Sequence, residues 1–200
     1  LPLKKHKKIV MNVEKNSELL PTKLTGQNIY LRTARMSDFE SIKVYRQDPE
    51  NSKYIRPPEN DDETLRIVDG LNKPWRFTEG KWNGFVICLT GDDTVIGEIV
   101  FRVEDWHNQR AEIGYRINQT AAGRGVCTEA LNLLVDLLFK DLGFFKLVAK
   151  CDPRNTGSYR VMEKQGFKRE AVFKEHYLLG DEWTDQYDYG LLASEWNKHN

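Results

Sequence analysis

The sequence predicts an α+β domain, a three-layer α/β arrangement in which about four helices flank a mixed central sheet of about seven strands. Short apolar-alternating segments recur along the chain, and turns at Gly91-Asp92-Asp93 and Gly180-Asp181 join two pairs of them. A long amphipathic segment lies between the strands of the second half. With 200 residues, the chain is long enough to bury a core as a single domain.

The first 26 residues are predicted to form a basic, flexible arm. Six lysines against two glutamates leave it with a local excess of positive charge. Such a run is usually a solvated tail and sometimes contacts nucleic acid or a partner. The folded domain is expected over residues 27–192, with a C-terminal tail at 193–200.

The first half of the domain contains three strands and two helices. Ser37-Asp38-Phe39-Glu40 reads as a capping box that opens a helix to about Gln47. After Pro57-Pro58, Asn60 and Glu63 mark the start of a second helix, which runs to about Leu71. Apolar alternation predicts strands over 28–33, 83–90 and 94–104.

The second half carries the segment that is most informative about function. A strand over 110–117 runs into the turn Gly123-Arg124-Gly125, and a helix follows from about 124 to 142. Asn155 is suited to cap a further helix, which Gly166 closes. The remaining strands are expected over 145–151, 167–178 and 183–192. Glycines and a helix N-terminus allow backbone N–H groups to approach a phosphorylated ligand.

Composition excludes several classes of protein. Thirty basic and thirty acidic residues cancel, so direct nucleic-acid binding is not expected. No apolar run is long enough for a membrane span, and no signal-peptide pattern occurs. Three cysteines without a CxxC pair indicate reduced thiols in a cytoplasmic protein and no metal site. Cys127 is either a packed thiol or one whose pKa the helix dipole lowers, and packing is favoured.

Three segments together resemble the GNAT superfamily of N-acetyltransferases, and within it the RimJ/RimL-type branch. They are AEIGYRIN followed by AAGRGVCTEAL, NTGSYRVMEKQGF at 155–167, and GDEWTDQY at 180–187. The resemblance covers residues 28–192. Thr120 departs from the Gln or Arg that usually begins the family's loop, whereas Gly123 and Gly125 fit it. The implied fold is the GNAT fold, with a mostly antiparallel sheet.

The resemblance implies acetyl-CoA as cosubstrate. The strand at Tyr115, Arg116 and Ile117 would splay from its neighbour and pair with the pantetheine arm. Backbone N–H groups of the glycine turn would hold the pyrophosphate, and Asn155 and Ser158 would approach the pantetheine or the departing sulfur. The turn residues are Ala122, Gly123, Arg124, Gly125, Val126 and Cys127.

Glu112 is the candidate general base, acting directly or through a water. The alternative is a solvent-face glutamate paired with Arg102 or Arg110. The general acid of the superfamily is usually a tyrosine, but Met162 occupies the matching position. Ser158 or Tyr159 would then replace it, although core packing of Tyr159 is favoured. His176 is a further candidate relay, with a structural role favoured there as well.

The acceptor is less well defined by the sequence. The acidic run at 59–63 either attracts a cationic amine or forms an acidic first helical turn, and the second is favoured. Trp75, Trp82 and Trp106 either line the cleft or pack at its rim. The leading hypothesis is acetyl transfer to a primary amine of a protein N-terminus, such as a ribosomal protein, or of a small molecule.

Two other functions compete with this hypothesis. One is a CoA-binding sensor or docking module without transferase activity. The other is a nucleotide-binding protein, which the absence of a P-loop motif disfavours. The sequence leaves the oligomeric state open, including a homodimer.

Overall fold

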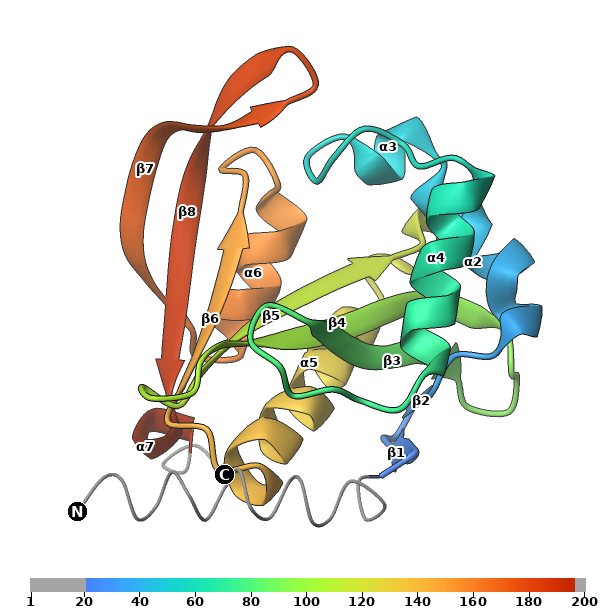
Figure 1. Ribbon diagram of the computed structural model, residues 1–200, viewed down its shortest axis with the longest axis horizontal. Helices are drawn as coiled ribbons and strands as arrows, with labels where there is room; N and C mark the ends of the chain where they lie inside the picture. Colours follow the sequence, from blue (N-terminus) through green and yellow to red (C-terminus); the bar gives the residue numbers. More distant parts are fainter. Residues whose placement is uncertain (1–20, 197–200) are drawn as a thin grey trace.

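The computed structural model describes residues 21–196, which form one eight-stranded sheet in the order β1-β2-β3-β4-β5-β6-β8-β7 (Figure 1). Neighbouring strands are antiparallel except β5 and β6, which are parallel. The expected mixed, mostly antiparallel sheet is therefore confirmed. The strands are β1 (Lys23–Thr25), β2 (Ile29–Arg32), β3 (Trp82–Leu89), β4 (Val95–Asp105), β5 (Arg110–Ile117), β6 (Lys146–Cys151), β7 (Lys168–Leu179) and β8 (Glu182–Leu192).

The eighth strand is β1, which lies inside the segment expected to be a flexible arm. Leu24 pairs with Leu31 of β2 in antiparallel register. A strand of three residues with only its central side chain partly buried is too short to produce a recognisable alternation. Residues 1–20, the rest of the expected arm, lie outside the described residues.

Helices cover both faces of the sheet, as expected (Figure 1). One layer contains α2 (Phe39–Arg46), α3 (Pro49–Ser52) and α4 (Asp61–Asn72). The other contains α6 (Thr156–Lys164) and α5 (Val126–Asp136), which continues as a π-helical turn over Leu137–Asp141. Short 3-10 turns occupy Met36–Asp38 and Gln119–Ala121.

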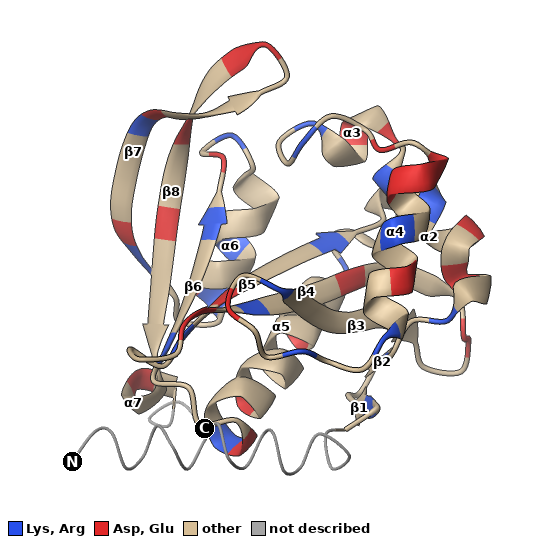
Figure 2. Cartoon of the chain, viewed as in Figure 1, with Lys and Arg blue, Asp and Glu red and all other residues tan. Residues whose placement is uncertain are grey.

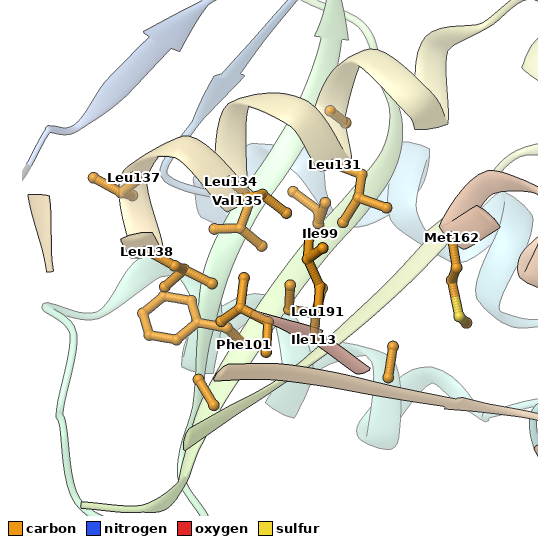
Figure 3. Close-up of a cluster of buried hydrophobic side chains, with 14 of the residues drawn as sticks. Ile99, Phe101, Ile113, Leu131, Leu134, Val135, Leu137, Leu138, Met162 and Leu191 are labelled. Atoms are coloured by element: carbon orange, nitrogen blue, oxygen red, sulfur yellow. The ribbon is translucent and has the colours of Figure 1, made fainter. Parts of the chain in front are cut away.

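The larger core lies between α5 and the centre of the sheet. Leu131, Leu134 and Val135 of α5 are at most 1% exposed. They belong to the same buried cluster as Phe101 of β4 and Ile113 of β5 (Figure 3). This stripe at helical spacing fixes α5 on the sheet, and so fixes the position of its N-terminus.

The structure confirms two of the predicted caps and corrects the third. The side chain of Asn60 accepts from the Glu63 N–H and completes a capping box at α4, and Asn155 caps α6. The box expected at Ser37 and Glu40 does not form. The Asp38 carboxylate instead accepts from the Arg35 N–H and pairs with both terminal nitrogens of buried Arg32, so a 3-10 turn precedes α2.

Two short helices were not predicted. In α3, Asp48 caps a single turn that begins at Pro49. In α7 (Ala193–Trp196), Trp196 is 3% exposed and its indole N–H donates to Asp136 at 2.7 Å. Residues 193–196 are therefore packed on the domain rather than forming a tail. Helices of four residues carry too little periodicity to be recognised.

Candidate active site

The sheet opens between β5 and β6. These parallel strands pair from Arg110 and Lys146 only as far as Ile113 and Ala149, after which the register ends. A cavity of about 1230 Å³ lies here, and the ends of both strands, Ile113–Ile117 and Lys150–Cys151, line it. The expected splay of the strand at 115–117 is therefore present in the backbone.

The N-terminus of α5 forms one wall of this cavity. Gly123 and Gly125 have φ values of +76° and +78°, a region that side chains other than glycine rarely adopt. A Cβ at either position would meet no atom within 4 Å, so the glycines are needed for backbone conformation rather than for close packing. Ala122, Val126 and Cys127 also line the cavity, whereas Arg124 is exposed outside it.

Cys127 is a packed thiol. Burial raises its pKa to about 12, which outweighs any effect of the helix dipole. Burial likewise raises the pKa of Cys151, at the end of β6, to about 12. Both thiols line the cavity, and both are protonated at neutral pH.

Glu112 lies on the sheet face beneath α2 and α4, with its side chain 10% exposed. Its Oε2 accepts from Arg102 Nη2 at 2.7 Å and Nε at 3.2 Å, and from Lys150 Nζ at 3.0 Å. Within the described residues, no hydrogen bond reaches Oε1. All three side chains line the cavity, so one carboxylate oxygen is fixed by two cations and the other is open to a further partner.

A second carboxylate stabilises the same cations. Glu104 pairs with Arg110 and accepts from Lys150 at 3.3 Å. Burial alone would lower the pKa of Lys150, but the hydrogen bonds and charges of Glu112 and Glu104 outweigh it, and the pKa is raised. Of the two partners that the alternative reading offered Glu112, Arg102 is the one it pairs with, whereas Arg110 pairs with Glu104; the side chain is buried rather than solvent-facing. Lys150 was not predicted, because its proximity depends on the β5–β6 register.

Ser158 lies in the first turn of α6, on the opposite side of the sheet from Glu112. Its N–H donates to the Asn155 side chain at 3.2 Å. The Tyr115 hydroxyl donates to the Ser158 carbonyl oxygen at 2.8 Å, and Ser158 Oγ donates to the Tyr115 hydroxyl at 3.2 Å. Asn155, Ser158 and Tyr115 all line the cavity.

The Tyr159 side chain packs against another aromatic ring and does not line the cavity. Its ring meets Tyr187 edge-on at 6.1 Å between centroids, and it is absent from the cavity lining. Met162 is 1% exposed and belongs to the larger buried cluster (Figure 3), and it also lines the cavity. His176 also lines the cavity, from β7, with its ring 4.7 Å from that of Phe173.

Arg116 belongs to a buried ion-pair network. Its guanidinium donates to Glu59 at 3.0 Å, and Glu59 accepts from Arg46 at 2.6 Å, which also pairs with Glu98 of β4. The guanidinium of Arg116 is therefore held by Glu59 through Nη1, and Arg116 also lines the cavity.

The acidic side chains of the run at 59–63 belong to this network and to the first turn of α4. Glu59 is buried in this network, and Asp61, Asp62 and Glu63 form the first turn of α4 (Figure 2). Among the candidate tryptophans, only Trp82 lines the cavity, where Arg102 stacks on its ring at 4.8 Å. Trp75 and Trp106 pack against the larger core.

Between residues 21 and 196, no group of three or more His, Cys, Asp and Glu side chains could hold a metal ion. Over the same range, no helix is both long and apolar enough to cross a membrane.

A glycine-rich helix N-terminus beside two diverging parallel strands is suited to binding a phosphorylated ligand. The acetyltransferase (GNAT) domain model matches residues 28–168, and the chain belongs to this family of N-acetyltransferases. An uncharacterized N-acetyltransferase of Bacillus subtilis, YnaD, is 30% identical over 174 residues, covering 87% of this chain and 99% of the relative.

Two further proteins are similar to this chain. The ribosomal-protein-serine acetyltransferase of Escherichia coli is 31% identical over 94 residues, which cover 47% of this chain and 52% of that protein. The structure of Mycobacterium smegmatis RimJ in complex with CoA-disulfide has a TM-score of 0.76 at 23% identity, covering 88% of this chain and 90% of that chain. At 23% identity, the likeness to the RimJ structure shows a shared fold.

Proposed function

We propose that the cavity between β5 and β6 binds acetyl-CoA, and that the chain transfers its acetyl group to a primary amine by direct attack in a ternary complex. One observation carries the proposal: the strand divergence, the N-terminus of α5, Glu112 and Ser158 all border a single cavity. Diverging strands supply free backbone groups, and the helix N-terminus supplies N–H groups for phosphates.

Transfer needs a neutral amine, a held carbonyl and a stabilised oxyanion. Glu112 is the proposed general base, because its Oε1 has no partner among the described residues and can accept a proton from the amine or a water. A backbone N–H at 115–117 is the proposed oxyanion donor. The cavity extends to both faces of the sheet, which supports attack from the Glu112 side and departure of the sulfur on the Ser158 side.

The proposed acceptor is a protein N-terminus. The partial likeness to a ribosomal-protein-serine acetyltransferase supports this choice over a small amine. The arm and its lysines have no assigned role in this proposal.

Thermal unfolding with acetyl-CoA tests the cosubstrate. At about one hundred times its dissociation constant, a ligand adds roughly 2.7 kcal/mol, which corresponds to several degrees in a chain of this size. ATP serves as the control. A shift with acetyl-CoA alone, followed by thiol release with an N-terminal peptide, is expected. An equal shift with ATP, or none with either, would contradict the proposal.

A further inference from the structure

Arg116 lies on the same face of β5 as Glu112, the face from which the proposed attack comes. Alternate residues of a strand point to the same side of the sheet, so Glu112, Gly114 and Arg116 form one row, and all three line the cavity. The two charged residues are about 13 Å apart along the strand, at about 3.3 Å per residue. The row therefore has the proposed base at one end, a guanidinium at the other and the bare backbone of Gly114 between them.

The Arg116 guanidinium is only partly engaged by the protein. Its Nη1 donates to Glu59 at 3.0 Å, and within residues 21–196 no hydrogen bond involves its Nε or Nη2. Over the same residues, the one buried side-chain polar atom without a partner is Thr184 Oγ1. Nε and Nη2 of Arg116 therefore keep some access to solvent, although the residue is only 5% exposed, and the space that Arg116 borders is the cavity.

The ion pairs around Arg116 leave one positive charge unbalanced. Glu59 accepts from Arg46 at 2.6 Å and from Arg116 at 3.0 Å. The exposed Arg56 lies 3.6 Å from the same carboxylate. Glu98 is opposite Arg116 in the β4–β5 register, but it is bonded by Arg46. Three guanidiniums thus share two carboxylates, and an anion that reached this cluster would balance it.

The side of this cluster that faces the cavity is cationic. Arg56 and Arg116 line the cavity, whereas Glu59 does not. Glu98 also lines it, but Arg46 Nε donates to one of its oxygens and Arg46 Nη2 to the other. A ligand at this wall therefore meets two guanidiniums and a carboxylate that is already paired.

We propose that Arg116 is the specificity-determining residue of an acceptor subsite, and that its Nε and Nη2 bind the carboxylate of an aspartate or glutamate that follows the N-terminal residue of the acceptor. This inference rests on the proposed function. Nε and Nη2 form one edge of the guanidinium, so they can donate two parallel hydrogen bonds to a carboxylate. With the reacting amine near Glu112, the acceptor chain crosses the bare backbone at Gly114 and extends its second side chain toward Arg116.

The test compares an acidic acceptor with its amide isostere. Two peptides differ only in aspartate or asparagine at the second position, and thiol release gives kcat and KM for each. The wild type should favour the aspartate peptide by about tenfold in kcat/KM, as for a hydrogen bond to a charged group, and the gain should lie in KM. Because the contact is short-range, the preference should persist at about 1 M salt, where the Debye length is about 3 Å. A preference that vanished there would come from the diffuse charge of the cavity and would contradict the inference.

Arg116→Lys removes the planar edge and leaves a cation for Glu59. It should bring the aspartate-to-asparagine ratio of kcat/KM close to one, with kcat/KM for the asparagine peptide nearly unchanged. A purely structural role for Arg116 would instead lower kcat/KM for both peptides by the same factor. Arg56→Gln changes an exposed side chain and should lower the ratio by about threefold, the size of a surface charge interaction. If Arg116→Lys does not fold, Arg56→Gln decides.

Lys73→Gln is the matched control for Arg56→Gln. Lys73 is exposed to a similar extent and pairs with Asp69, but it does not line the cavity, so the ratio should keep its wild-type value. A wild-type ratio near one, or a wild-type ratio retained in both arginine variants, would overturn the inference; the proposed function would stand if acetyl-CoA stabilises the protein and both peptides are acetylated. Absence of both turnover and stabilisation by acetyl-CoA would overturn the two together.

Discussion

Glu112 keeps one carboxylate oxygen on Arg102 and Lys150 and leaves the other without a partner among the described residues. Two cations at hydrogen-bonding distance hold the carboxylate from one side. A base anchored in this way can accept a proton on its other oxygen without reorganisation.

Glu112→Gln should therefore lower turnover by about 10²–10⁴-fold, because the amide cannot accept the proton, with little change in acetyl-CoA affinity. Thiol release and thermal shift measure the two quantities. Glu104→Gln is the control, since Glu104 belongs to the same ion-pair cluster but does not line the cavity. Equal losses in both variants would assign Glu112 a structural role.

Where a motif names them, the residues that line the cavity could be predicted from the sequence. Which of these residues contact one another in the fold could not. Gly123, Gly125, Asn155 and Ser158 border the cavity as expected. For the tyrosines, the sequence singled out Tyr159 as a possible acid and gave Tyr115 only a cofactor-binding role. Which tyrosine reaches Ser158 depends on where β5 passes α6, a long-range feature that no local pattern records.

At the scale of elements, a buried ion-pair network joins α2, the start of α4, β4 and β5. Arg116, at 5% exposure, has its pKa lowered by burial first and by the nearby Arg46. Glu59 is its partner at 3.0 Å. Because a buried charge without a partner is costly, the network fixes the positions of these elements.

Glu59→Gln should lower the free energy of unfolding by about 3–5 kcal/mol, the usual cost of breaking a buried pair. Denaturant unfolding measures it. Glu50→Gln, which alters an exposed pair with Lys53 at 3.7 Å, should change stability by at most about 1 kcal/mol. Similar losses in both variants would show that the buried network is not stabilising.

Glu129 connects α5 to the β1–β2 turn. Burial alone would raise its pKa, but hydrogen bonds from Asn28 and Gln27 outweigh it and the pKa is lowered. A carboxylate with a lowered pKa stabilises the folded state above its unfolded pKa, and this stability is lost as pH falls through the folded value.

The Tm of Glu129→Gln should therefore lie below that of the wild type at neutral pH, and the difference should shrink as pH falls below about 4. Scanning calorimetry across this range measures it. Glu182→Gln, in an exposed pair with Arg154, is a control with little expected effect at any pH. A constant difference down to low pH would contradict the assignment.

Element types were largely predictable because the strands alternate and the longer helices have caps and stripes. The exceptions, β1, α3 and α7, are short elements whose formation depends on neighbours: β1 needs β2, and α7 needs Asp136 of α5. A neighbour also accounts for the box that does not form at Ser37, because Asp38 binds both Arg32 and the Arg35 N–H, and the turn is capped at Arg35 instead.

At the scale of the whole molecule, net charge is zero, but the lining of the cavity is not balanced. Nine Arg and Lys residues line it against four Asp and Glu residues, and Arg66 of α4, Arg102 and Lys150 are among the cations. Such a surface repels polycationic acceptors and attracts acidic ones.

A peptide with an acidic residue next to its N-terminus should therefore be acetylated with a kcat/KM about tenfold higher than one with lysine there, a difference of about 1.4 kcal/mol. The advantage should decline as salt rises. Thiol release with the two peptides measures it, and Arg66→Gln should reduce the gap. Equal rates at low salt would contradict this prediction.

The early end of the β5–β6 pairing has a consequence for the donor. Beyond Ile113 and Ala149 the sheet offers peptide groups at the fixed spacing of a strand, about 3.3 Å per residue. On the proposed function, the amides of the pantetheine arm engage this edge as an added strand would. The spacing of the peptide groups then fixes the position of the pantetheine arm along the strand edge. The length of the arm determines the distance between the thioester carbonyl and Glu112. A donor whose arm is one methylene shorter would bind in the same register and present its carbonyl out of reach.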